Sequence, residues 1–400
     1  MANTNSSFQL KGEVANKAKT ILLVLATLGW IGTIIAFATN KDQAFSAYLS
    51  SFIYWASLSI GATFFVMLQR LTQAEWSVVV RRIAETVMTN FWILAILFIP
   101  ILFGLHSLYE WTHLENPEVA NDPLLKGKSG FLNQKFFMIR AVIYIAVWCF
   151  LSWKLYSYSI KQDQNGDPQE TRRAAKLSAP GVPLLILTAS FAAIDWLMSL
   201  QPHWYSTMWG VYYFAGGGIT FMALLIVLCV WLRSNGQLSD VITVEHYHDM
   251  GKLLFAFNVF WTYIAFSQYF LIWYANLPEE TIFFVARKAG DWRGISWLLL
   301  FGHFVIPFLA LVSRYAKRHP VILPVMSCWM LFIHAVDHFW IVMPTHNPAT
   351  VAWGSLWMNI ASMVAIGGTC FYFYVVRLSQ HSLVPSRDPF LEESLEFENA

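Results

Sequence analysis

Long runs of apolar residues, separated by short polar connections, make up most of the chain between residues 20 and 377. An α-helix needs roughly 20 apolar residues to cross a hydrocarbon layer about 30 Å thick. Ten runs reach this length, and they are apolar on nearly all sides rather than along one stripe. The pattern therefore predicts an all-α integral membrane protein with ten transmembrane helices. The runs cover residues 20–39, 44–69, 82–106, 136–158, 180–201, 208–232, 253–275, 294–314, 320–343 and 352–377.

Short motifs recur along the chain in the same order, which indicates an internal duplication. The segment Ala193–Trp196 is matched by Ala335–His338, 142 residues later, and Tyr54–Ala56 is matched by Tyr213–Ala215, 159 residues later. Both shifts span four helices, which preserves direction across the bilayer as a parallel repeat does. Chance similarity among apolar segments is the alternative. We expect two related four-helix bundles, formed by the second to fifth helices (44–201) and the sixth to ninth helices (208–343) and flanked by the first and tenth.

Composition narrows the class of protein. Only 12% of the 400 residues are charged, against about 25% in typical soluble domains, and 57% are hydrophobic. The net charge of +2 gives no basis for binding nucleic acid. The four cysteines lie singly inside predicted helices without any C-x-x-C spacing, so neither a disulfide framework nor a cysteine-held cluster is expected.

Lys and Arg are distributed unevenly between the two sides of the predicted bundle. The segments on the side of the N-terminus carry 18 of them, and the segments on the other side carry seven. Because cytoplasmic loops are enriched in Lys and Arg, both termini are predicted to be cytoplasmic. The expected organisation is a cytoplasmic N-terminal tail (1–18), the ten-helix domain (19–380) and an acidic cytoplasmic tail (381–400) that is disordered unless a partner orders it.

Ionisable residues inside predicted helices are costly in a bilayer and point to chemistry. His334, Asp337 and His338 have the i, i+3, i+4 spacing that puts side chains on one helix face. The helical rise of about 1.5 Å per residue puts them in the outer half of the bilayer, at the level of Asp195 and His303. An Asp–His set suits proton exchange, because imidazole titrates near neutral pH. A proton relay or a quinol site needs such groups, and a purely structural Asp–His bond between helices is the alternative.

Two further regions offer relay candidates. Arg82 and Glu85 lie at the cytoplasmic start of the third helix, where Arg81 and Glu85 are one turn apart. These residues form either an internal ion pair or the mouth of a proton path. The seventh helix carries Tyr263 among several other polar residues, so we expect it to face a bundle interior where its hydroxyl groups support a relay.

Cofactor sites have little support in the residue pattern. His303 with His334 or His338 offers a haem ligand pair, but the two pairs of a cytochrome-b-like bundle are missing. Segment 245–249 contains metal-capable side chains on an expected solvated loop or subunit contact. We therefore predict no metal site, no covalently bound cofactor and no assigned catalytic residue. Segment 278–293 is expected to form a short amphipathic helix on the outer surface.

Several sequence segments carry a resemblance to a known family. The chain resembles the polysulfide-reductase-type (NrfD-like) integral membrane subunits, and among them the smaller such subunit of bacterial alternative complex III, a quinol:cytochrome c oxidoreductase. The similarity covers about residues 15–380. It rests on His246–Lys252, Phe255–Tyr263, Phe266–Tyr269, Tyr274–Glu280, Ala193–Trp196 and Gln201–Trp204.

The resemblance implies a multi-pass subunit of a respiratory complex in the bacterial inner membrane. Its implied partners are a larger homologous membrane subunit, multihaem cytochromes c, an iron–sulfur subunit and membrane lipids. Haem and iron–sulfur clusters would lie in the partners, while this subunit would conduct protons and could bind menaquinol. A purely structural anchor for the redox subunits and a proton-coupled secondary transporter are the alternatives. The relay or quinol candidates are Asp195, His303, His334, Asp337, His338, Arg82, Glu85 and Tyr263.

Overall fold

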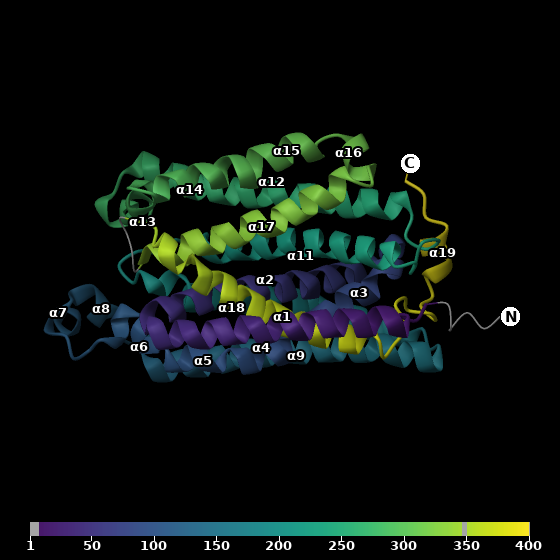
Figure 1. Cartoon of the computed structure of the whole chain (residues 1–400), viewed down its shortest axis with the longest axis horizontal. Helices are drawn as coiled ribbons and strands as arrows, with labels where there is room; N and C mark the ends of the chain where they lie inside the picture. The colour runs from purple at the N-terminus through teal and green to yellow at the C-terminus, as the bar shows by residue number, and fades with distance from the viewer. Residues whose placement is uncertain (1–7, 346–349, 400) are drawn as a thin grey trace.

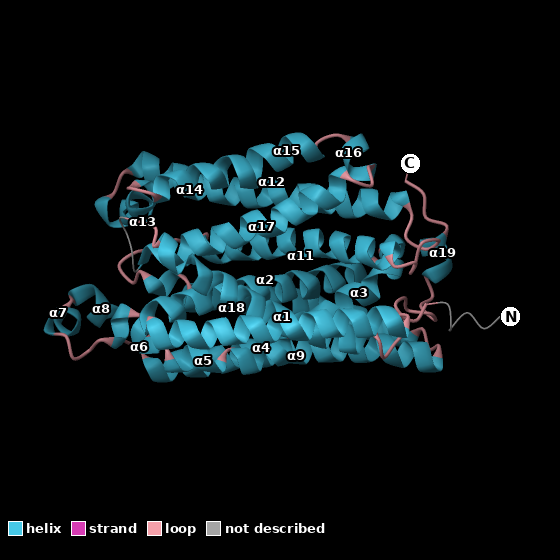
Figure 2. Cartoon of the chain, viewed as in Figure 1, coloured by secondary structure: helices cyan, strands magenta, loops and turns pink. Residues whose placement is uncertain are grey.

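The computed structural model describes residues 8–345 and 350–399 and is helical almost throughout, with no strand in these ranges (Figures 1 and 2). Ten of its helices are long and apolar enough to cross a membrane. The predicted fold class, an all-α integral membrane protein with ten spans, is confirmed. The spans are Gly12–Thr39, Lys41–Thr72, Glu75–Phe103, Gln134–Asn165, Gln169–Leu200, Trp209–Ser234, Val244–Ala275, Trp292–Leu311, Ile322–Thr345 and Trp353–Leu378.

Within these spans the individual helices have the following bounds. The first two spans are α1 (Gly12–Thr39) and α2 (Lys41–Thr72), and the third is divided into α3 (Val78–Met88), α4 (Phe91–Leu97) and α5 (Ile99–Phe103). The next four are α9 (Gln134–Asn165), α10 (Gln169–Trp196), α11 (Trp209–Ser234) and α12 (Val244–Ala275). The last three are α14 (Trp292–Leu299) continuing into α15 (Ile306–Leu311), α17 (Ile322–Val342) and α18 (Leu356–Leu378).

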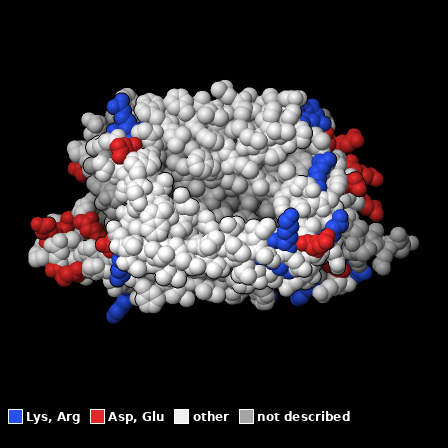
Figure 3. All heavy atoms as spheres, in the orientation of Figure 1, with Lys and Arg blue, Asp and Glu red and all other residues white. Residues whose placement is uncertain are grey.

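The helices run along the long axis of the molecule, and both chain termini lie at the same end (Figure 1). We call this end the terminus end and the other the opposite end. Lys, Arg, Asp and Glu gather at the two ends of the face in Figure 3 and leave a broad band without charge between them. Such a band matches the hydrocarbon layer of a bilayer, so the chain is a multi-pass membrane protein.

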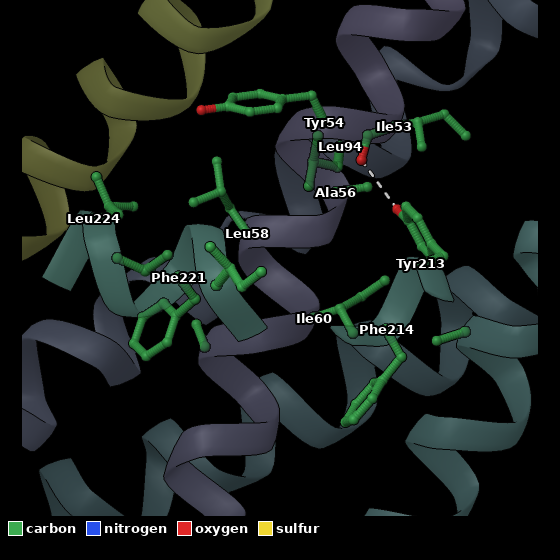
Figure 4. Packing of buried hydrophobic residues seen from close by; sticks show 14 of the residues in the cluster. Ile53, Tyr54, Ala56, Leu58, Ile60, Leu94, Tyr213, Phe214, Phe221 and Leu224 are labelled. Carbon is green, nitrogen blue, oxygen red and sulfur yellow. Dashed lines mark hydrogen bonds between the residues drawn. The ribbon is translucent and has the colours of Figure 1, made fainter. Parts of the chain in front are cut away.

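The two most enclosed helices, α2 and α11, cross at the centre of the bundle. A Cβ atom on Gly61 would lie 2.2 Å from the carbonyl oxygen of Gly217, and one on Gly217 would lie 2.8 Å from the carbonyl oxygen of Ser57. Close backbone contact between membrane helices requires such small residues. The Tyr213 hydroxyl donates a hydrogen bond to the Ile53 carbonyl across the same contact, at 3.0 Å (Figure 4).

The helices around this centre make corresponding contacts in the two halves of the chain. Helix α10 packs on α2 of its own half and on α11 of the other, and α17 packs on α11 of its own half and on α2 of the other. Helices α1 and α18 pack along each other and on α2, outside this arrangement. The contacts are those that two related bundles would make, although the duplication itself stays a prediction from the sequence.

The third span is not the single helix that the sequence predicts. It is interrupted between α3 and α4 and again at Phe98, next to Pro100, whose ring has no N–H to donate to the helix. The carbonyl groups released at these breaks find other donors. Arg377 of α18 donates to the Thr89 carbonyl at 2.7 Å, and the Tyr48 hydroxyl donates to the Leu97 carbonyl at 2.7 Å.

Several predicted boundaries were wrong because polar sequence extends the helices beyond the apolar runs. Segment 159–178, which lies between the apolar runs 136–158 and 180–201, is helical except around Gly166, which has a positive φ and ends α9. The seventh span begins at Val244 rather than at residue 253, because Thr243 and His246 form a capping box there. Helix α1 begins at Gly12, inside the predicted tail 1–18, of which residues 1–7 lie outside the described range.

Short helices cover both ends of the bundle. At the opposite end, α6 (Leu105–Leu108), α7 (Pro117–Asn121) and α8 (Pro123–Lys128) form a projecting lobe (Figure 1). Helix α13 (Pro278–Lys288) lies at the same end, in the segment where a short amphipathic helix was predicted. At the terminus end lie α16 (Arg314–Arg318) and α19 (Leu391–Leu395).

Candidate functional site

Five buried polar side chains from three spans meet inside the second half of the bundle, and we call them the His–Asp cluster. His334, Asp337 and His338 project from one face of α17, as their spacing predicts. His303 comes from the preceding span and Tyr212 from α11. All five side chains are almost completely enclosed, with exposures of 0–1% for the four ionisable groups and 5% for Tyr212.

A local change of helix type positions His303. Residues Leu300–Val305 form a π-helical segment between α14 and α15. Pro307 lacks the N–H that would bond to the His303 carbonyl in an α-helix, which favours the wider geometry. The Trp329 indole of α17 donates to the released Gly302 carbonyl at 2.7 Å. The Trp261 ring of α12 stacks on the His303 ring with centroids 3.7 Å apart.

Two side-chain hydrogen bonds and one longer contact connect four of the five groups. The Tyr212 hydroxyl donates to Asp337 Oδ1 at 2.5 Å. Asp337 Oδ2 lies 3.6 Å from His334 Nδ1, which lies 3.1 Å from His303 Nε2. His338 Nδ1 donates to the His334 carbonyl at 3.0 Å, so its Nε2 carries the lone pair of the neutral ring. Tyr212, Asp337, His334 and His303 thus form a row of neighbouring polar groups, and a ring nitrogen of His338 lies within 4.8 Å of Asp337 and His334.

The cluster contains several polar atoms without a partner. His303 Nδ1, His334 Nε2, Asp337 Oδ2 and His338 Nε2 make no hydrogen bond within the described part of the chain. Buried polar atoms are paired in most proteins, and each unpaired one costs about 1–3 kcal/mol. Four such atoms in one cluster are poorly explained by helix joining alone, because a structural bond would satisfy them.

Glycine packing fixes the position of His334. A Cβ atom on Gly216 of α11 would lie 2.3 Å from Cε1 of the His334 ring, so the ring fits only against glycine. The Tyr54 ring of α2 lies beside both His334 and His338, with centroids 6.3 and 5.8 Å away. The small residues of α11 thus serve close packing on both sides, against α2 and against this histidine.

The haem alternative does not fit this geometry. His303 and His334 are hydrogen-bonded to each other directly at 3.1 Å, and the centroids of the His334 and His338 rings are 4.5 Å apart. Axial ligands must face each other across the iron and its porphyrin plane. His303 and His334, one of the two predicted ligand pairs, instead contact each other and leave no room for an iron between them.

Asp195, the counterpart of Asp337 in the predicted repeat, lies in a different environment. Arg140 of α9 binds both its carboxylate oxygens, with Nε to Oδ2 at 2.7 Å and Nη2 to Oδ1 at 2.8 Å. The Tyr144 hydroxyl donates to Oδ2 at 2.8 Å. The Arg140 guanidinium is enclosed between the Phe131 and Phe136 rings. Asp195 is therefore a saturated ion pair, separate from the His–Asp cluster.

An arginine also approaches Asp337, but it is bound elsewhere. Arg287 of α13 is 1% exposed and donates to the main-chain carbonyls of Trp340 at 3.0 Å, Ile341 at 2.6 Å and Phe283 at 2.9 Å. It contributes a favourable electrostatic interaction to Asp337, yet no salt bridge joins the two. Arg140 therefore forms a salt bridge with its aspartate, whereas Arg287 donates its hydrogen bonds to main-chain carbonyls instead.

Arg82 and Glu85 belong to a second buried cluster at the terminus end, which we call the arginine cluster. It contains Arg70, Arg81, Arg82, Glu85, Asp163 and Asp388. Glu85 accepts from Arg70 at 3.1 Å and from Arg82 at 3.2 Å, and it lies 3.7 Å from Arg81 as the one-turn spacing predicts. Three guanidinium groups face three carboxylates, so the formal charges cancel and the cluster is suited to holding helices together.

The C-terminal tail, predicted to be disordered, packs across the terminus end. Asp388 pairs with Arg70 at 3.2 Å and with Arg81, and Leu383 is fully buried. The Ser394 hydroxyl donates to the Trp76 carbonyl at 3.0 Å, and the Ser394 carbonyl accepts from His246 at 3.0 Å. Arg70 and Arg81 neutralise Asp388 and so hold the tail in place. The acidic composition of the tail gives no sign of these distant partners.

We predict that acid releases this tail. Burial disfavours the charged carboxylate, but Arg81 and Arg70 outweigh it and lower the pKa of Asp388 below its usual 3.8. A lowered pKa stabilises the folded state above the unfolded value, about pH 4, and this stabilisation is lost as the pH falls through the folded pKa. Cleavage of residues 383–399 by an acid-active protease should therefore begin only below about pH 4.

Two variants make the acid experiment specific. Asp388→Asn should expose the tail to proteolysis already at neutral pH, because the two arginines lose their carboxylate. Glu392→Gln, in the same tail but outside the arginine cluster, should behave as the unmodified chain does. A tail that remains protected in Asp388→Asn would contradict the role given to Asp388.

The seventh span is only partly turned toward the bundle. Asn258 and Gln268 are buried, as expected for a helix facing an interior. Tyr263 is 64% exposed on the lipid side and contacts none of the His–Asp cluster, so the expectation that it faces inward was wrong. Segment 245–249 was also misplaced, because it forms the first turn of α12 rather than a loop.

Several groups at these sites went unrecognised in the sequence. Arg140 and Asp195 are both charged and both lie within helices, so their pairing was predictable from the cost of burying either alone. Tyr212 and Trp261 carry no such signal among the many aromatic residues of the chain.

No protein-family model matches the chain, and no curated protein is significantly similar to it.

Proposed function

We propose that this chain is a proton-conducting membrane subunit of a quinol-oxidising respiratory complex of the alternative complex III type. The redox centres belong to partner subunits, and the His–Asp cluster accepts and transfers protons released when quinol is oxidised. The chain itself carries out no bond-making step. The quinol that supplies the protons is dissolved in the bilayer. The partners of the chain are those of the family that the sequence resembles.

One observation carries the proposal, the contrast between the two repeat-related aspartates. Asp195 is fixed in a bidentate ion pair with no free acceptor, whereas Asp337 keeps one oxygen without a hydrogen bond. A group that exchanges protons needs a free position and a titrating neighbour. Asp337 has both, because His334 and His338 offer ring nitrogens within 4.8 Å of its carboxylate, and Asp195 has neither.

Buried hydroxyl groups support conduction between the two ends. Ser57 and Thr63 on α2 and Thr220 on α11 are completely buried between the His–Asp cluster and the arginine cluster. Tyr54 and Arg70 are separated by 16 residues of one helix, which is about 24 Å at the α-helical rise. Each hydroxyl donates to its own helix and keeps lone pairs that accept a proton.

The hollow face in Figure 3 offers a quinol an approach from the membrane. The surface is hollowed over α2 and α11, between α17 and α18. Its atoms are uncharged, which suits the aromatic ring and isoprenoid tail of a quinol. Helix α17, which borders this hollow, carries His338, whose Nε2 has no hydrogen-bond partner among the described residues.

The two rival functions have weaker support. A purely structural anchor needs satisfied bonds, as in the Arg140–Asp195 pair, and leaves the four unpaired atoms of the His–Asp cluster unexplained. A secondary transporter is typically built from helices that are broken at matching places in its repeats. Here the interruptions lie in the third and eighth spans, which are not counterparts under the four-helix offset.

Isolation from native membranes tests the assignment to a complex. We expect the tagged full-length chain, purified in mild detergent, to bring haem-staining proteins, an iron–sulfur protein and a second multi-pass subunit with it. Quinol:cytochrome c reductase activity should co-elute with these proteins. A chain that elutes alone, from membranes that keep this activity in other fractions, would contradict the proposal.

A further inference from the structure

The lobe at the opposite end carries a second group of histidines that the proposed function does not use. His106 lies in α6, and His113 follows the short turn Glu110–Thr112. Glu115 comes two residues later. The lobe also carries several acidic residues, visible at its surface in Figure 3. His106 and Glu115 are exposed and His113 is half-buried, at the membrane boundary beyond the uncharged band.

The three side chains converge on one point. The His106 and His113 rings stack with centroids 4.1 Å apart, and His106 Nε2 lies 2.8 Å from Glu115 Oε1. One nitrogen from each histidine and one oxygen from the glutamate lie within 4.8 Å of one another. Small side-chain rotations would bring these three atoms to three corners of a tetrahedron around one ion.

Hydrogen bonds already prepare two of the ligands. His113 Nε2 donates to the His106 carbonyl at 2.5 Å, which leaves Nδ1 with the lone pair that a metal binds. Backbone carbonyls orient metal-binding histidines in this way in known sites. The Glu115 carboxylate accepts from the His106 ring nitrogen at 2.8 Å, which holds its oxygen beside the imidazole.

The backbone beneath the three ligands is anchored. Tyr109, Trp111 and Thr112 are buried at the base of the turn. The Tyr109 hydroxyl donates to the Trp196 carbonyl of α10 at 3.0 Å, and the Thr112 hydroxyl donates to the Tyr109 carbonyl at 2.7 Å. The turn therefore presents His106 and His113 from a fixed scaffold rather than from a free loop.

We propose that His106, His113 and Glu115 form a binding site for a divalent transition-metal ion at the opposite end of the bundle. Two histidines and one carboxylate with an open fourth position are a ligand set that Zn²⁺ uses. The site was not predicted from the sequence, because His-x6-His-x-Glu matches no common metal-binding spacing. The site is independent of the quinol proposal, since it lies on the lobe and involves none of the His–Asp cluster.

Titration of the purified full-length chain with Zn²⁺ tests this site. Calorimetry should show one ion bound per chain. His106→Ala and His113→Ala should each weaken binding at least tenfold, and Co²⁺ should give the visible absorption of a tetrahedral complex. Because His106 is 64% exposed and His113 is only half-buried, these variants should fold normally. Zn²⁺ should raise the thermal unfolding midpoint of the unmodified chain and not that of the variants.

His203, which follows α10 and contacts Asp122 of the same lobe, provides a matched control. It forms a similar imidazole–carboxylate pair, with Nε2 2.8 Å from Asp122 Oδ2, but lacks a second histidine. His203→Ala should bind Zn²⁺ as the unmodified chain does. The proposal is overturned if the chain binds no Zn²⁺, if His106→Ala and His113→Ala bind it unchanged, or if His203→Ala loses it to the same extent.

Discussion

Asp337→Asn is expected to lower quinol oxidation by the assembled complex about 10²- to 10⁴-fold, the usual contribution of a general acid or base, while the protein still folds. Asparagine has the same shape and keeps an oxygen that accepts the Tyr212 hydroxyl. No cation loses its partner, because Arg287 is held by carbonyl groups. The loss therefore reflects the missing proton acceptor. The measurement is the rate of quinol oxidation with simultaneous recording of proton release.

Two controls separate chemistry from structure in this experiment. Tyr263→Phe removes a hydroxyl that lies on the lipid side, 64% exposed, and should leave both rates unchanged. The thermal unfolding midpoint of Asp337→Asn should stay within a few degrees of the original. Unchanged oxidation and proton release in a folded Asp337→Asn complex would refute the role of the His–Asp cluster.

The ten spans were predictable because the membrane imposes a length and an apolar composition that remain recognisable when a span contains single polar residues. The helix ends were less predictable, since polar caps such as Thr243 and interruptions such as the one at Phe98 depend on local hydrogen bonding. The ordered tail is the clearest case. Its acidic residues look like a solvated segment until Arg70 and Arg81, more than 300 residues earlier, are placed beside Asp388.

The site was half predictable for a related reason. Helical spacing alone put His334, Asp337 and His338 on one face, and the structure adds His303 beside them. The depth of Asp195 along its helix did not predict that this residue lies outside the His–Asp cluster. Depth fixes a level in the bilayer but not a neighbour, and the neighbour of Asp195 is Arg140 rather than a histidine. The two aspartates at matching positions of the predicted repeat are therefore expected to differ in role: Asp195 forms a structural ion pair, and Asp337 exchanges protons.

Asp195→Asn is expected to destabilise the folded protein by about 3–5 kcal/mol, because it leaves the buried Arg140 guanidinium without its counter-ion. The double variant Arg140→Met with Asp195→Leu removes both charges and should recover most of this loss, as apolar replacements of buried ion pairs do. Denaturation in detergent, followed by the fraction of helical structure lost, measures both effects.

The two aspartates can then be compared in one assay. If Asp195 is structural, the double variant should restore stability and oxidise quinol nearly as fast as the original, although neither residue can carry a proton. If Asp195 took part in proton transfer, the double variant would be stable and slow. Recovery of folding without recovery of turnover would therefore move Asp195 into the proton path, and recovery of both would leave Asp337 as the aspartate that exchanges protons.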